Sequence, residues 1–146
     1  MKTFFKELFE YHNHVNQMLA DMLIEHSNEI SERSIPLFSH MLNGHQIWNS
    51  RVLEISPVGV SDVRSLEENK VMDNSNFHDT LQILKNEDLA REIVYYNSRG
   101  DSYNNSVRDM LFQAANHHTH HRGQIISDLR LHGIKPMITD YIFFRR

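Results

Sequence analysis

The length of 146 residues suits one domain with one hydrophobic core, and we expect residues 1–146 to form that single domain. The net charge of -4, with no run of basic residues, argues against a nucleic-acid partner, which would need a basic face to neutralise phosphates. The chain has no cysteine, which excludes disulfides and thiolate metal sites. It has neither an apolar run of about 18 residues nor a signal-peptide pattern, so we expect a cytoplasmic protein without a membrane partner.

The first two predicted elements are amphipathic helices. Residues 2–28 carry apolar side chains mostly at three- and four-residue steps, which is the period of a helix with one buried face. A second helix is expected to begin at Ser34, with Ser34 as its cap and Pro36 in its first turn. It should end before the helix-breaking residues 56–59.

The middle of the chain is more polar and less regular. Residues 60–73 show little apolar periodicity, and we expect mostly loop there. A third helix is expected over residues 76–92. The β-branched and aromatic residues at 93–96, together with Tyr103, flank a turn that contains Gly100, and this pattern predicts a small hairpin or extended ribbon.

The last predicted helix covers residues 106–132 and ends at Gly133, a good left-handed cap, with Pro136 just beyond it. The tail, residues 137–146, is too apolar to extend into solvent, so we expect it to pack on the helices. Four helices around one core, with a long crossover that contains the short ribbon, predict an all-α four-helix bundle.

The fourth predicted helix carries four of the eleven histidines within residues 117–121. Neutral imidazole is the commonest protein ligand for transition metals. His117 and His121 lie about 40° apart on a helical wheel and one turn from each other, so both can bind one ion. His118 with His121 is a second possible pair. The competing interpretation is a solvated, pH-responsive histidine patch.

A third ligand has to come from another helix, because catalytic zinc sites usually take three protein ligands and keep one position open. The first predicted helix offers His12 and His14, and the second offers His40 and His45. His45 falls inside the apolar stripe of its helix and His40 falls just outside it. Periodicity alone therefore prefers His45.

The motif His117-x-x-x-His121-Arg122-Gly123-Gln124 resembles the signature of the DinB-like (DinB/YfiT) superfamily, named for bacterial DNA-damage-inducible proteins. The likeness extends to residues 8–16, to residues 40–51 and to the tail. It implies a four-helix bundle in which three histidines hold a divalent ion. Those residues would be His40, His117 and His121, since the family's second-helix histidine stands eight positions before a tryptophan, as His40 does before Trp48. His45 stays as the alternative third ligand.

The resemblance also implies a function. Relatives include thiol-dependent transferases and isomerases, and others are proposed as metal-dependent hydrolases, so we expect thiol S-transferase or hydrolase chemistry on a small molecule such as a low-molecular-weight thiol. The ion would be zinc or nickel, with iron and manganese as alternatives. The family also points to a homodimer. A non-enzymatic metal-binding stress-response protein is the alternative function.

The surroundings of the motif carry further expectations. Four polar residues are expected to orient the ligand rings through hydrogen bonds: Asn116, His120, Arg122 and Gln124. Arg122 has a second interpretation, pairing with a carboxylate on another helix. Gly123 is expected to allow close helix packing. No glutamate lies between His117 and His121, which argues against the zinc-protease mechanism.

Overall fold

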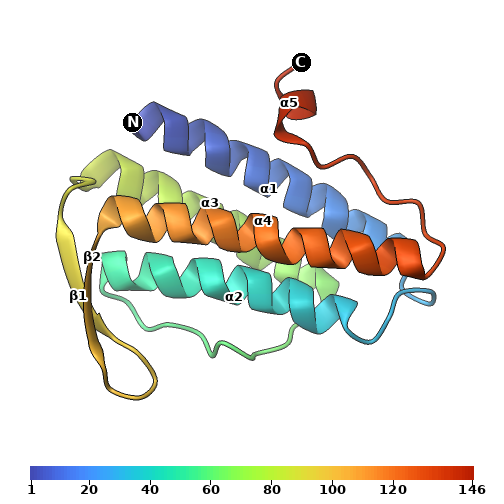
Figure 1. The fold of residues 1–146 in the computed structure, drawn as a ribbon, viewed down its shortest axis with the longest axis horizontal. Helices are drawn as coiled ribbons and strands as arrows, with labels where there is room; N and C mark the ends of the chain where they lie inside the picture. Colours follow the sequence, from blue (N-terminus) through green and yellow to red (C-terminus); the bar gives the residue numbers. More distant parts are fainter.

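Four long helices run side by side in the computed structural model, which describes all 146 residues (Figure 1). They are α1 (Lys2–Glu25), α2 (Ser34–Leu53), α3 (Leu66–Asn86) and α4 (Val107–Leu131). Strands β1 (Glu92–Tyr96) and β2 (Ser102–Ser106) form an antiparallel hairpin between α3 and α4, and the short helix α5 (Tyr141–Phe144) lies near the C-terminus. The predicted helical fold and hairpin are confirmed. None of the helices combines the length and apolar character that a membrane crossing requires.

The core consists of two apolar clusters with a polar layer between them. α2 packs mainly against α4 and α3, and α1 packs mainly against α3. One cluster, which includes Phe9 and Met110, lies toward the hairpin, and the other, which includes Leu19 and Ile125, lies toward the opposite end. Between these positions along α1 and α4 lie several buried polar side chains: His12, Asn16, His118 and Arg122. The middle of the protein is therefore polar inside.

α3 differs most from the prediction, because it begins at Leu66 and ends at Asn86 rather than spanning residues 76–92. The residues that point inward from α3 are mostly polar, so they leave no apolar stripe in the sequence: Asn69, Asp73, Asn76 and Thr80. The expectation of mostly loop over residues 60–73 is therefore wrong for residues 66–73, which are helical. The start is marked by a capping box, in which the Ser65 hydroxyl accepts from the Glu68 N–H and the Glu68 carboxylate accepts from the Ser65 N–H.

The ends of α2 and α4 follow the prediction closely, with one exception. α2 begins at Ser34 with Pro36 in its first turn, but Ser34 does not cap the helix. Its hydroxyl instead donates to the carboxylate of Asp128 on α4, over 3.1 Å. At the end of α4, Gly133 takes the expected left-handed conformation, with a φ of 76°.

The tail folds back along α1, as predicted (Figure 1). The hydroxyl of Tyr11 on α1 donates to the backbone carbonyl of Thr139 over 2.5 Å. The Tyr11 ring also contacts Tyr141 and Phe144 of α5 edge-on. One aromatic residue of α1 thus anchors the tail through both a hydrogen bond and ring contacts.

Candidate metal centre

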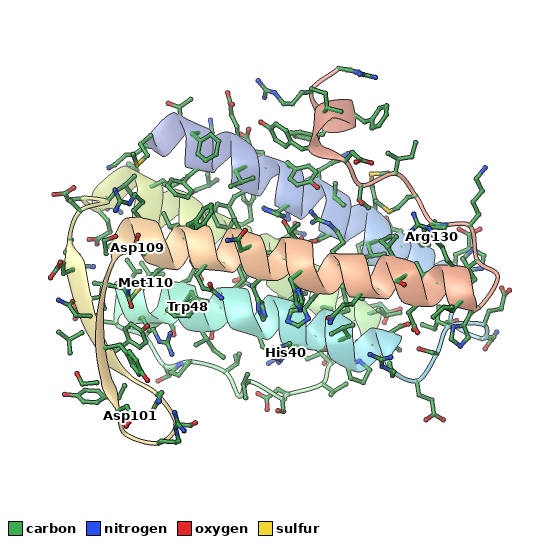
Figure 2. The ribbon with its side chains drawn as sticks, in the orientation of Figure 1. His40, Trp48, Asp101, Asp109, Met110 and Arg130 are labelled. Carbon is green, nitrogen blue, oxygen red and sulfur yellow. The ribbon has the colours of Figure 1, made fainter.

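Three histidines from two helices meet where α2 and α4 run side by side. His40, His117 and His121 each offer a ring nitrogen, and these atoms all lie within 4.8 Å of one another. The ring centroids of His117 and His121 are 4.3 Å apart, and those of His40 and His121 are 4.7 Å apart. Figure 2 shows His40 on α2, next to α4. The structure thus brings together the three residues that the family resemblance singled out.

Each helix contributes to this meeting in a different way. His117 and His121 are one turn apart on α4, so their side chains project in nearly the same direction. α2 supplies His40 and, one turn later, Gly44. A Cβ atom at position 44 would lie 2.5 Å from Cδ2 of His117 and would also overlap its Nε2. The absence of a side chain at Gly44 therefore makes room for the His117 ring.

The glycine expected to allow close helix packing was Gly123, and that expectation is wrong. A Cβ atom built at Gly123 has no neighbouring atom within 4 Å. Gly44 has this role instead. One signal for this role is present in the sequence, since Gly44 stands one turn after His40 on a helix that is expected to supply a third ligand.

Hydrogen bonds prepare each of the three imidazoles to act as a ligand. Nδ1 of His40 donates to the carbonyl of Val60 over 3.1 Å. Nδ1 of His121 donates to the side-chain oxygen of Gln124 over 2.7 Å, and Nε2 of His117 donates to the carbonyl of His40 over 3.4 Å. Each bond occupies one ring nitrogen and leaves the other with a free lone pair, which is the form that binds metal. The expected orienting role of Gln124 agrees with this geometry.

Burial keeps two of these histidines uncharged. Desolvation, together with the neighbouring His121, lowers the pKa of His117 to about 4. Desolvation also lowers the pKa of His121, although its bond to Gln124 works in the opposite direction. Both imidazoles are therefore neutral at pH 7, so a metal ion would not have to displace protons from them.

A groove opens beside His40. It has a volume of about 530 Å³ and is lined by seven residues: Glu32, Arg33, Pro36, Leu37, His40, Ser61 and Val63. His40 belongs both to this lining and to the three-histidine group. A small molecule in the groove would therefore lie next to a metal ligand.

The other histidines considered as ligands do not reach this group. His45 and His118 are buried and bond to each other, with 2.9 Å between Nδ1 of His45 and Nε2 of His118. The second nitrogen of His45 lies 2.8 Å from the hydroxyl of Thr80. His12 stacks on His118, and His14 is exposed and packs near Phe144 of the tail. Periodicity identified His45 as inward-facing, and this direction takes it into the core and away from His117.

These buried histidines form a separate, closed polar layer. Desolvation lowers the pKa of His45 to about 3 and lowers the pKa values of His12 and His118 well below their usual range. The Arg122 guanidinium lies beside His12 and His118 and lowers their pKa values further. A fixed positive charge next to three bonded, neutral rings makes this layer unfavourable for a metal ion.

Arg122 has neither of the two roles that its sequence position suggested. Its buried guanidinium donates to the hydroxyl of Tyr11 over 2.7 Å, to Nδ1 of His12 over 3.1 Å and to the side-chain oxygen of Asn16 over 3.3 Å. It bonds to no ligand ring and forms no ion pair with a carboxylate. Arg122 instead ties α4 to α1, and its neighbour His121 faces the opposite helix.

Comparison with known proteins identifies the family of the chain. The model of the DinB family matches residues 1–146, which is the whole chain. No curated protein and no solved structure matches the chain.

Proposed function

The chain belongs to the DinB family, and from this membership and the three convergent histidines we propose that the protein is a divalent-metal-dependent enzyme. His40, His117 and His121 would hold the ion. The four long helices fit the four-helix bundle that the resemblance implies. The reaction we propose is thiol transfer or hydrolysis on a small molecule.

The observation that carries this proposal is the hydrogen bonding of the three imidazole rings. Each imidazole has one nitrogen bonded to an oxygen acceptor and one nitrogen free, and the three rings lie on rigid helices. The group contains no carboxylate, so a divalent ion bound there would keep its full charge. Such an ion supplies Lewis acidity, which activates a water molecule or a thiol. Nitrogen ligands suit zinc and nickel best, with iron and manganese as alternatives.

The groove beside His40 favours an enzyme over a non-enzymatic metal-binding protein. A storage or structural site is usually closed by protein ligands, whereas a catalytic site keeps a position open to substrate. The half-buried rings and the groove that His40 lines leave such access. The chain's own residues would orient the ligands, through Val60 and Gln124, and receive the substrate.

Metal analysis tests the site directly. Protein purified without a histidine tag should contain close to one equivalent of metal per chain. Single replacements of His40, His117 or His121 by alanine should remove most of it. His120→Ala and His45→Gln serve as matched controls and should keep it. His120 forms no hydrogen bond to a ligand ring, contrary to the expectation from sequence, and His45 bonds to Thr80 and His118 instead. Full metal content in a His117→Ala/His121→Ala double variant would refute the proposed site.

Activity assays then separate the enzyme from the alternative. The metal-loaded protein should accelerate either the reaction of a small thiol with 1-chloro-2,4-dinitrobenzene or the hydrolysis of 4-nitrophenyl acetate. The same protein treated with a chelator should lose this activity and regain it with added metal. A fully loaded protein that accelerates no reaction in a broad panel of thiols and esters would favour the non-enzymatic metal-binding role.

The proposal also includes a homodimer of the chain. Large apolar side chains are exposed near the hairpin end of α1 and α4, among them Phe4 and Phe112. They line a second groove with Met1 and Phe5. Contiguous exposed apolar surface of this kind is typical of protein contacts. Sedimentation velocity of the wild type and of a Phe112→Ser variant tests this point, since the variant should sediment as a monomer.

A further inference from the structure

The groove beside His40 carries two opposite charges without ion-pair partners. Glu32 and Arg33 are exposed and line it. Neither side chain forms an ion pair with another residue. Hydrogen bonds from Ser31 and Ser34 lower the pKa of Asp128 on α4, and the charge of Arg33 lowers it further without forming an ion pair. Neither charge in the groove is thus neutralised by a direct ion pair.

The two charges and His40 lie at different positions along the axis of α2. Arg33 immediately precedes α2, and His40 lies seven residues farther along the chain. At 1.5 Å per residue, this separation amounts to about 10 Å along the helix axis. Pro36, Leu37 and Val63 line the same groove and provide an apolar wall. The groove therefore has a metal-ligating group at one end, and its lining also supplies apolar contacts and two opposite charges.

We propose that this groove binds a small molecule with a zwitterionic, α-amino-acid-type headgroup about 10 Å from its metal-binding atom. Arg33 would donate to the carboxylate of the headgroup, and Glu32 would accept from its ammonium group. The inference rests on the proposed function for the end of the ligand that reaches His40. It adds the chemical class of the other end and names Arg33 and Glu32 as the residues that select it.

A zwitterion fits these charges better than a simple anion or cation. A phosphate ester would be attracted by Arg33 but repelled by the adjacent Glu32. An amine without a carboxylate would be attracted by Glu32 but repelled by Arg33. A headgroup with both charges satisfies both residues. The volume of about 530 Å³ lies within the usual range for small-molecule sites.

The first experiment uses matched thiol probes on the cobalt-loaded protein. Nε-mercaptoacetyl-L-lysine carries the amino-acid headgroup, a four-carbon chain and a terminal thiol. N-butyl-2-mercaptoacetamide has the same chain and thiol without the headgroup. Binding is followed through the sulfur-to-cobalt charge-transfer absorbance. The lysine probe should bind about tenfold more tightly than the butyl probe, since exposed ion pairs are individually weak.

Variants assign this preference to the two charges. Arg33→Ala should reduce the tenfold preference to less than about threefold and leave the affinity for the butyl probe unchanged. Glu32→Gln should lower affinity for the lysine probe but not for 6-(mercaptoacetamido)hexanoate, which has the carboxylate alone. Arg108→Ala, at the opposite end of the protein, removes an equal charge and should change neither affinity. An unchanged preference in Arg33→Ala would overturn the inference.

A second experiment does not depend on the metal. Nε-acetyl-L-lysine, which has no metal-binding atom, is titrated into the protein while the methyl NMR signals of Leu37 and Val63 are recorded. These signals should shift, and the shifts should disappear in Arg33→Ala. Failure of cobalt to bind would refute the three-histidine site alone. Absence of methyl shifts, or shifts that persist in Arg33→Ala, would refute the headgroup site alone.

Discussion

The imidazole of His117 lies in the space that a side chain at position 44 would fill. A Cβ atom on Gly44 would come within 2.5 Å of Cδ2 of that ring. Because Gly44 follows His40 by one helical turn, α2 provides both a ring nitrogen for the group and the room for another ring to reach it. The backbone of α2 is therefore part of the site.

Gly44→Ala should lower metal affinity by at least about tenfold while leaving the fold intact. The added methyl group displaces the His117 ring, which can rotate outward. Alanine also favours the helix by about 0.5–1 kcal/mol over glycine, which offsets part of the steric cost. Competition with a chelating dye measures the affinity, and thermal unfolding measures the stability.

Gly123→Ala is the matched control, since the space around Gly123 is open. It should keep the wild-type metal affinity and raise stability by about 0.5–1 kcal/mol. If Gly44→Ala bound metal as tightly as Gly123→Ala, the space at position 44 would be irrelevant to the site.

Acid should destabilise the metal-free protein through its buried histidines. Below pH 6.5 the unfolded chain protonates His45, whereas the folded protein, in which the pKa of His45 is about 3, does not. The stability that neutral His45 provides is complete above pH 6.5 and is lost as pH falls toward 3, at about 1.4 kcal/mol per pH unit. His12 and His118 act in the same direction.

Asp73 opposes this trend, because burial raises its pKa to about 6. Between about pH 4 and 6 the folded protein therefore keeps a proton on Asp73 that the unfolded chain has already lost, and this proton stabilises the fold as the pH falls. Urea unfolding in a chelator between pH 7 and 5 separates the contributions. His45→Gln should show a pH dependence that is shallower than that of the wild type by about 1.4 kcal/mol per pH unit below pH 6. The exposed His14→Gln variant is the control. Equal slopes in wild type and His45→Gln would contradict the prediction.

The same polar layer explains why one helix was only half predicted from the sequence. α1, α2 and α4 have apolar stripes that meet in the two clusters, and their spans follow from periodicity. α3 instead buries Asn69, Asp73 and Asn76 in its first half, so its inward face looks like loop. What the hydrophobic pattern cannot show is which polar residues have partners on other helices. The capping box at Ser65 was the local signal available.

Tyr11→Phe should release the tail from α1. The hydroxyl of Tyr11 donates to Thr139 and accepts from Arg122, so its removal leaves a buried guanidinium short of one partner. We expect a loss of about 1–3 kcal/mol in stability. Hydrogen exchange of residues 137–146 should become faster.

Tyr141→Phe provides the comparison, because that ring touches Tyr11 but its hydroxyl has no hydrogen bond. It should change stability by less than about 0.5 kcal/mol, as expected for a surface substitution. Equal exchange of the tail in the two variants would show that the Tyr11 hydroxyl does not anchor it.

Arg51 should be required for firm docking of the hairpin on α2. Its guanidinium carbon lies 4.1 Å from the ring centre of Trp48 on α2 and 4.2 Å from that of Tyr95 on β1. Arg51→Gln should cost about 0.5–2 kcal/mol. Trp48 is the single tryptophan, so its fluorescence reports the change. Arg99→Gln at the hairpin tip should leave the emission unchanged, and an equal effect of both variants would exclude a specific role for the stack.

The candidate site was predicted from sequence to a different degree for each histidine. The helical spacing of His117 and His121 is enough to place both rings on one side of α4. The third residue is not fixed by periodicity, which preferred His45, because a wheel assigns one burial direction to a whole helix. α2 has two partners, and His40 faces the edge near α4 while His45 faces the interior. Only the family motif distinguished them.

His117 and His118 are neighbours in the chain, yet one faces the groove side of α4 and the other is sealed in the core. One extra residue in α4 ahead of them would turn both by about 100°. His117 would then take the buried direction of His118, and His118 would take the exposed direction of Thr119. The number of residues between the cap of α4 at Ser106 and His121 therefore determines which histidines face α2. Insertions or deletions in the hairpin would leave this number unchanged, and the hairpin tip at Gly100 has open space around it.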